Sequence, residues 1–100
     1  MKKLVLVTGA NGFTGRHVCE ILLKKNISFV VVLRPETDPT WMNKNKIEVR
    51  YADLFDHRNL TKAFKGGFCL LNVASIGFGS IHSILLACKK NGIERAIFIS

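Results

Sequence analysis

Three glycines near the start of the chain have the type and spacing needed to hold a phosphate-bearing ligand. Gly9, Gly12 and Gly15 lie three residues apart, between an apolar run over residues 4–7 and a segment with helical spacing. A glycine in a tight turn reaches backbone angles closed to other residues, and a glycine at a helix start lets a pyrophosphate approach the backbone. The unpaired amide hydrogens and the dipole of that helix end favour negative charge. Because this loop follows a strand signal and opens a helix, the pattern predicts a dinucleotide site.

One basic residue indicates which dinucleotide the site prefers. Arg34 ends the second apolar run of the chain. An acidic side chain at this position binds the ribose 2′-hydroxyl of NAD, whereas an arginine accommodates the 2′-phosphate of NADP. Neither residue 33 nor residue 34 is acidic, which favours NADP over NAD. The alternative is that Arg34 is a solvated loop residue; Arg16, which follows Gly15, could likewise assist a phosphate or serve on the surface.

Short apolar runs alternate with amphipathic segments along the rest of the chain, and these segments must position the glycine loop and Arg34. The expected strands cover residues 4–7, 28–33, 47–51, 68–74 and 95–99. Helices are expected after the glycine loop, in a short segment that Asp56 can cap and that holds Leu60, Ala63 and Phe64, and over residues 80–91. Residues 36–46 are expected to form a loop that could contain a short helix. The expected apolar helix faces are Val18, Ile21 and Leu22 with the stem of Lys25 in the first helix, and Ile81, Ile84, Leu85 and Cys88 in the last.

This alternation predicts an α/β, Rossmann-like fold: a doubly wound parallel sheet covered on both faces. Right-handed crossovers favour about five strands in the order 3-2-1-4-5, with the chain truncated after strand five. Residues 1–100 are therefore expected to form one incomplete NAD(P)-binding Rossmann domain. The strand over residues 47–51, in which apolar and charged residues alternate, is expected at an edge.

The segment over residues 8–15, TGANGFTG, resembles the TGxxGxxG signature of the extended and atypical short-chain dehydrogenase/reductases, the superfamily that includes NAD-dependent epimerases and dehydratases and NmrA-like proteins. The resemblance continues through Asp53-Leu54, through Asn72-Val73-Ala74-Ser75 and through the strand ending at Ser100. It implies an adenine contact at Asp53 and Leu54, and a segment along the dinucleotide at Ala74 and Ser75. The expected cofactor-binding residues are Gly9, Asn11, Gly12, Phe13, Thr14, Gly15, Arg34, Asp53, Leu54, Ala74 and Ser75. Asp53 has a second interpretation, in which it only shapes the turn before the next helix.

The catalytic pair that this superfamily commonly uses, a tyrosine and a lysine four residues apart, is not found in the sequence. Its one tyrosine, Tyr51, has no lysine at that spacing, and no catalytic residue is predicted. The first hypothesis is therefore the NADP(H)-binding portion of an oxidoreductase or nucleotide-sugar epimerase, inactive by itself. The second is a non-catalytic NADP-binding regulatory or redox-sensor module. The third is a basic nucleic-acid-binding protein on a Rossmann-like scaffold.

The composition of the chain restricts which classes of partner are expected. The 100 residues carry a formal net charge of +8, which favours an anionic ligand, but the lysines fall near expected helix ends rather than on one face, so nucleic acid ranks low. No apolar run is long enough to span a membrane, and no metal site is expected from the scattered histidines and three widely spaced cysteines. These features predict a cytoplasmic protein. Strand 95–99 offers an unprotected edge, so self-association is expected there or at the 81/84/85/88 helix face.

Overall fold

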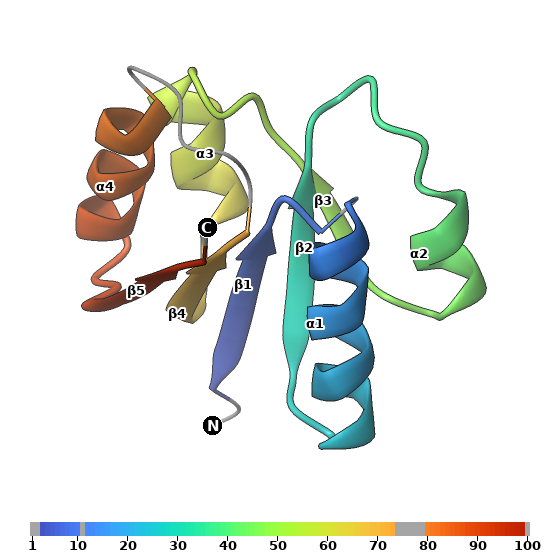
Figure 1. The fold of residues 1–100 in the computed structure, drawn as a ribbon. Helices are drawn as coiled ribbons and strands as arrows, with labels where there is room; N and C mark the ends of the chain where they lie inside the picture. The colour runs from blue at the N-terminus through green and yellow to red at the C-terminus, as the bar shows by residue number, and fades with distance from the viewer. Residues whose placement is uncertain (1–2, 11, 74–79, 100) are drawn as a thin grey trace.

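A parallel sheet of five strands forms the centre of the computed structural model, which describes residues 3–10, 12–73 and 80–99. The strand order is β3-β2-β1-β4-β5, and every neighbouring pair is parallel (Figure 1). The strands are β1 (Leu4–Thr8), β2 (Phe29–Leu33), β3 (Val49–Tyr51), β4 (Gly67–Asn72) and β5 (Arg95–Phe98). The predicted Rossmann-like fold, its strand order and the edge position of β3 are confirmed.

Four helices within the described residues connect the strands and cover the sheet. The helices α1 (Phe13–Lys24) and α2 (Thr40–Lys44) lie on one face of the sheet, and α3 (His57–Ala63) and α4 (Ser80–Lys90) lie on the other (Figure 1). The short α2 falls inside the segment 36–46, where the sequence predicted a loop that could contain a helix. Asp56 caps α3 as predicted, because its carboxylate accepts hydrogen bonds from the backbone amides of Arg58 and Asn59 at 3.0 and 3.3 Å.

The strands are apolar on both sides because each side packs against a different pair of helices. In β1, Leu6 lies in the core cluster formed with α3 and α4, while its neighbour Val7 lies in the cluster formed with α1 and α2. In β2, Val30 lies in the cluster formed with α3 and α4, and Val31 lies in the cluster formed with α1 and α2. This alternation is the period of two that a strand imposes on its side chains, applied to a sheet with two dry faces.

The buried faces of two helices differ from those predicted. In α1 the buried residues are Gly15, Cys19 and Leu22, whereas Ile21 is exposed. In α4 the buried residues are Ser80, Ser83, Ile84, Ala87 and Cys88, whereas Ile81 and Leu85 are exposed. Ile84 and Cys88 are buried as predicted, but the rest of the α4 face was misplaced, because Ser80, Ser83 and Ala87 are buried in place of Ile81 and Leu85. Helical spacing located the helix correctly, but hydrophobicity alone did not fix its rotation.

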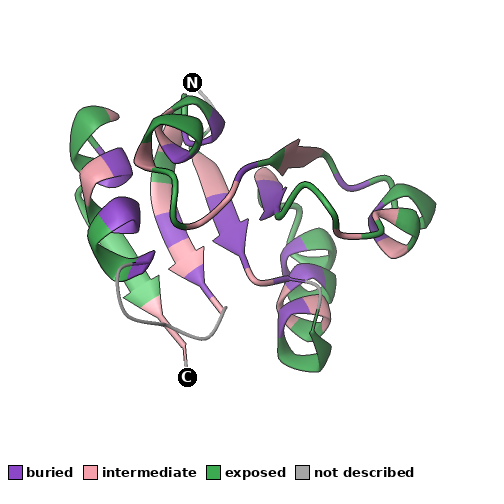
Figure 2. Ribbon diagram, turned by 90° about the horizontal axis from the view of Figure 1, so that it is seen from above, coloured by how far each residue is buried: buried purple, intermediate pink, exposed green. Residues whose placement is uncertain are grey.

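The β4–β5 side of the sheet is less covered than the continuous apolar pattern predicted. Phe68 of β4 is exposed, with the Lys3 ammonium 4.8 Å from its ring centroid. In β5 the first three residues are exposed, and Ile97 is 52% exposed. Figure 2 shows this contrast between exposed β5 and the buried centre of the sheet. Ile97 is exposed because no described element packs over it.

Candidate functional site

The three glycines of the first loop have three different structural roles. Gly9 adopts a φ of 79°, in the left-handed region that favours glycine, and so makes the sharp turn after β1. A Cβ on Gly15 would lie 2.4 Å from the backbone Cα of Ala10, so only glycine lets α1 approach the loop this closely. A Cβ on Gly12 would meet nothing within 4 Å. Gly12 therefore faces open space, where the protein itself does not require a glycine.

The N-terminus of α1 is arranged to attract negative charge. Gly12 is its N-cap with no side-chain hydrogen bond, and the first turn contains no acidic residue. The first amide to bond back within the helix is that of Arg16, which donates to the Gly12 carbonyl at 3.0 Å. Phe13 and Thr14 are exposed, Phe13 to 90%. Such a helix end binds anions through its backbone amides.

A hollow of about 170 Å³ lies beside the glycine loop, at the carboxyl ends of β1, β2 and β3. It brings together Gly9, Arg34 and Leu54, three residues that the sequence predicted as cofactor contacts. Its lining also includes residues that the sequence did not single out: Val32, Leu33, Thr37 and Ala52. Val32 and Ala52 could have been found from their positions at the ends of adjacent strands. The hollow is therefore mostly apolar with one cation at its border, and suits an aromatic base beside an anionic group.

Arg34 keeps most of its hydrogen-bonding capacity available. Its side chain is 55% exposed, and its one ion pair within the described residues joins its Nε to the Glu36 Oε1 at 3.2 Å. The guanidinium carries five N–H donors in a planar fork, so this single contact leaves donors for a ligand. The structure therefore places a largely unsaturated guanidinium on the border of the hollow.

Arg16 points to a different part of the surface. Its guanidinium carbon lies 5.4 Å from the ring centroid of Trp41 in α2, so the two side chains form a cation–π contact. It also lines a shallow depression with Phe13, His17 and Glu20, away from the residues of the hollow. In the loop before α2, the Asp38 carboxylate accepts hydrogen bonds from the Thr40 hydroxyl and amide, and these bonds lower its pKa. The contact with Trp41 joins α1 to α2, and the Arg16 Nε is buried with no hydrogen-bond partner among the described residues, so its two interpretations both stay open.

The two residues of the predicted adenine pair lie in different positions. Leu54 lines the hollow and packs against the core on the α3 side. The Asp53 carboxylate accepts a hydrogen bond from the Phe55 amide at 2.9 Å, which shapes the turn before α3. The turn-forming role of Asp53 is thus present in the structure, and its adenine contact stays a prediction.

The ends of β1 and β4 are joined by buried polar side chains. The hydroxyl of Thr8 donates a short hydrogen bond to the side-chain oxygen of Asn72, and both residues are buried. Since β4 ends at Asn72, this bond fixes where the segment leading to the predicted contacts leaves the sheet. Those contacts, Ala74 and Ser75, lie outside the described residues, as does Asn11 of the glycine loop.

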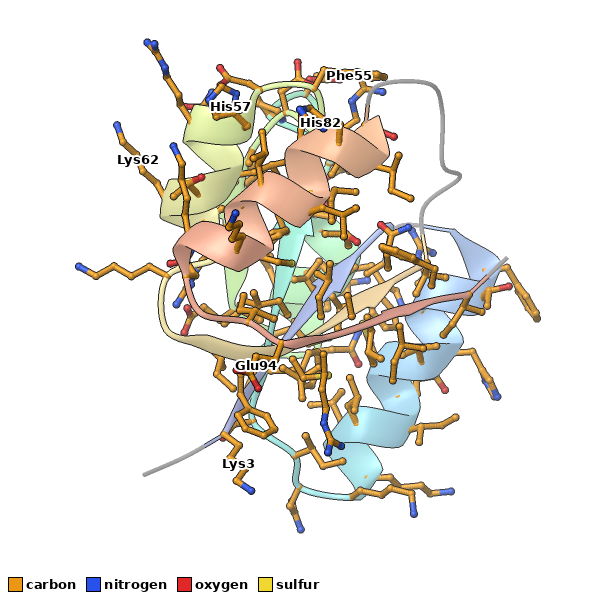
Figure 3. All side chains as sticks on the ribbon, turned by 90° about the vertical axis from the view of Figure 1, so that its left-hand side faces the viewer. Lys3, Phe55, His57, Lys62, His82 and Glu94 are labelled. Carbon is orange, nitrogen blue, oxygen red and sulfur yellow. The ribbon has the colours of Figure 1, made fainter. Side chains whose placement is uncertain are left out.

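The carboxyl end of the sheet also has polar and aromatic groups on the α3–α4 face. Figure 3 shows Phe55, His57 and His82 at this end of the molecule and Lys3 and Glu94 at the opposite end. The Ser83 hydroxyl donates to the Phe55 carbonyl at 3.4 Å, which joins α4 to the turn before α3. The described residues contain no group of three or more histidine, cysteine or acidic side chains that could hold a metal.

Two of the three cysteines, Cys19 and Cys88, are unsuited to act as nucleophiles. Burial raises the pKa of the Cys19 and Cys88 thiols to about 11, and Cys69 is partly buried. A thiol with a raised pKa is protonated and unreactive near neutral pH. Cys19 and Cys88 are therefore small buried thiols. Nor does any helix of the described residues have the length and apolar character needed to cross a bilayer.

The comparison with family models gives one match over most of the chain. Residues 5–82 match the model of the NAD dependent epimerase/dehydratase family. Among curated proteins, the chain is 36% identical to CDP-abequose synthase from Salmonella muenchen over 48% of its own length and 19% of that protein. Gly9, Arg34 and the other residues of the hollow all lie within residues 5–82, which the family model matches.

Solved structures reproduce the whole fold. One is a nucleoside-diphosphate-sugar epimerase from Staphylococcus aureus, with a TM-score of 0.81 and 26% identity over 100% of this chain and 38% of that one. Another is an NADPH-dependent quinone oxidoreductase from Escherichia coli complexed with NADPH, with a TM-score of 0.79 and 28% identity over 94% of this chain and 35% of that one. The chain thus spans well under half the length of these similar proteins.

Proposed function

We propose that this chain, which belongs to the NAD dependent epimerase/dehydratase family, binds NADP(H) in preference to NAD(H). It would do so as the nucleotide-binding portion of an oxidoreductase or an epimerase-like protein. The observation that carries the proposal is the position of Arg34. Its guanidinium borders a mostly apolar hollow next to Gly9, and its contact with Glu36 leaves most of its donors available. The NADPH complex of the similar quinone oxidoreductase supports the choice of cofactor.

Each part of the dinucleotide has a matching group in the proposal. The pyrophosphate would lie over Gly12 at the N-terminus of α1, where space is open and the helix dipole favours an anion. The adenosine would enter the hollow between β2 and Leu54, and the 2′-phosphate would bind Arg34 through charge-assisted hydrogen bonds. NADP(H) supplies hydride-transfer chemistry when bound. The described side chains bind and orient it.

Catalysis is not part of the proposal for these 100 residues. The sequence has one tyrosine, Tyr51, which lies half-exposed on the edge strand β3. General acid–base catalysis needs a group within hydrogen-bond reach of the reacting atom, and no tyrosine–lysine pair of the superfamily pattern is present. A tyrosine–lysine pair encoded downstream of residue 100 would separate this proposal from the second hypothesis, a non-catalytic NADP-binding regulatory or redox-sensor module. A cytoplasmic location is also proposed, supported by the three free cysteines.

The test of NADP(H) preference is a calorimetric titration of the chain with NADPH and with NADH. The expected result is tighter binding of NADPH, and Arg34→Asp should shrink or invert the preference by about thirtyfold, or about 2 kcal/mol, through the loss of two charge-assisted hydrogen bonds. Lys62→Asp is the matched control, because it makes the same charge change on α3, where Figure 3 shows the side chain pointing outward. Equal affinities in the unmodified chain would refute the cofactor assignment. NADPH binding that DNA displaces would favour the nucleic-acid hypothesis.

Self-association through the β5 edge is proposed as well. The strand presents exposed backbone and the half-exposed Ile97, with Arg95 as its one charged side chain. Since Ile97 is exposed, Ile97→Lys tests the edge without disturbing the core, and sedimentation should show fewer dimers than in the unmodified chain. Leu85→Lys, on the exposed side of α4, tests the alternative surface. A stable monomer at high micromolar concentration would exclude both surfaces.

A further inference from the structure

The loop after β2 carries an acidic residue that contacts the proposed cofactor-selecting arginine. Residues 34–37 form a tight turn, in which the Thr37 amide donates to the Arg34 carbonyl at 3.0 Å. Pro35 occupies the second position of this turn, where its fixed φ is favourable, and Glu36 occupies the third. The turn therefore holds Glu36 close to Arg34, and the Glu36 Oε1 lies 3.2 Å from the Arg34 Nε.

This contact lies on the border of the hollow. Arg34 and Thr37, the first and last residues of the turn, both line the hollow. A 2′-phosphate that binds Arg34 must therefore approach the same guanidinium that the Glu36 carboxylate already contacts. The phosphate carries close to two negative charges and the carboxylate carries one, so each disfavours the other at this distance. The 2′-hydroxyl of NAD is uncharged and meets no such repulsion.

We propose that Glu36 is a second specificity-determining residue of this pocket, which weakens the preference for NADP(H) that Arg34 creates. The inference rests on the proposed function, since it assumes that the 2′-phosphate binds Arg34. Glu36 occupies part of the guanidinium in the free chain and must be displaced from it, or remain beside the phosphate, when NADP(H) binds. The side chains are 55% and 69% exposed, so the ion pair itself is weak and displacement is feasible.

A neighbouring ion pair supplies the matched control. Glu48 contacts Arg50 with its Oε2 3.5 Å from the Arg50 Nε, in the same two-residue spacing, and neither residue lines the hollow. Glu36→Gln and Glu48→Gln each remove the negative charge of a glutamate that contacts an arginine, and each keeps the length of the side chain. Only the first change lies at the proposed 2′-phosphate position.

The experiment measures dissociation constants of NADPH and NADH for the unmodified chain, Glu36→Gln and Glu48→Gln. We expect Glu36→Gln to raise the ratio of the NADH to the NADPH dissociation constant by about three- to tenfold, and this gain to shrink in high salt. Glu48→Gln should leave the ratio unchanged. If the unmodified chain prefers NADPH but Glu36→Gln behaves like Glu48→Gln, the role of Glu36 is wrong and the proposed function stands. If the unmodified chain binds neither dinucleotide, the proposed function and the inference both fail.

Discussion

Arg34 directly follows β2 and Arg50 lies within the neighbouring strand β3; each is two residues from a glutamate, and they have opposite roles. The Arg50 Nη1 donates to the carbonyls of Ala63 and Lys65 at 2.9 and 2.7 Å, and the side chain is 29% exposed. Arg34 donates to no carbonyl that the structure describes, and it borders the hollow. Arg50 thus joins β3 to the end of α3, whereas Arg34 remains available to a ligand. The role of each arginine therefore follows from whether the protein already uses its hydrogen-bond donors.

The same distinction applies to the glycines, and there the expected effects are largest. Gly15→Ala should destabilise the fold by about 3 kcal/mol or more, because the new Cβ would collide with the Ala10 backbone. Gly12→Val should leave the fold largely intact and weaken NADPH binding by about a hundredfold or more, because the side chain enters space that the pyrophosphate needs. Thermal melts and calorimetry of both variants separate the two effects. Retained binding in Gly12→Val would show that the glycine loop has a structural role only.

Replacing the two arginines by methionine tests the comparison directly. Arg50→Met should lower the free energy of unfolding by about 2 kcal/mol, because two backbone carbonyls lose a charged donor. Its NADPH-to-NADH preference should stay as in the unmodified chain. Arg34→Met should show the reverse, with nearly unchanged stability and a reduced preference. Urea denaturation measures the free energy of unfolding, and titrations with NADPH and NADH measure the preference. Equal destabilisation by the two variants would show that the two arginines do not differ in their structural role.

Two aspartates before α3 give the smallest expected effects. Asp56→Ala should lower the free energy of unfolding by about 1 kcal/mol, because the first turn of α3 loses its cap. Asp53→Ala should cost a similar amount by removing the hydrogen bond to the Phe55 amide. NADPH affinity discriminates between the two interpretations of Asp53. If Asp53 also contacts adenine, NADPH affinity falls in Asp53→Ala but not in Asp56→Ala. Equal affinities in the two variants would show that Asp53 only shapes the turn.

The sequence was a reliable guide wherever the physical requirement is local. Glycine spacing between a strand and a helix predicted the loop whose geometry the structure shows at Gly9, Gly12 and Gly15. Alternating apolar runs predicted five parallel strands and their order, because right-handed crossovers leave few arrangements. The cap at Asp56 was also predicted, since a capping side chain acts on amides two and three residues away.

The sequence misled where burial depends on what packs against a residue. Ile81, Leu85 and Ile97 are apolar, and they are exposed because no described element covers them. Ser80 and Ser83 are polar, and both are buried; the Ser83 hydroxyl donates to the Phe55 carbonyl in the turn before α3. Hydrophobicity states what a side chain favours, but the neighbouring elements decide whether the preference is met.

The roles of the two arginines show the same division most clearly. By itself, the sequence determined the parallel sheet, the glycine loop and a basic residue at the end of β2, because these follow from local geometry and chain order. It singles out Arg34 by its position after the second apolar run, but it does not show which arginine has its donors already in use. Only the tertiary structure places carbonyls 13 and 15 residues distant against Arg50, and leaves Arg34 beside a hollow formed by three strands. The physical reason is that saturation of a side chain's donors is a property of its spatial neighbours, which the sequence brings together only on folding.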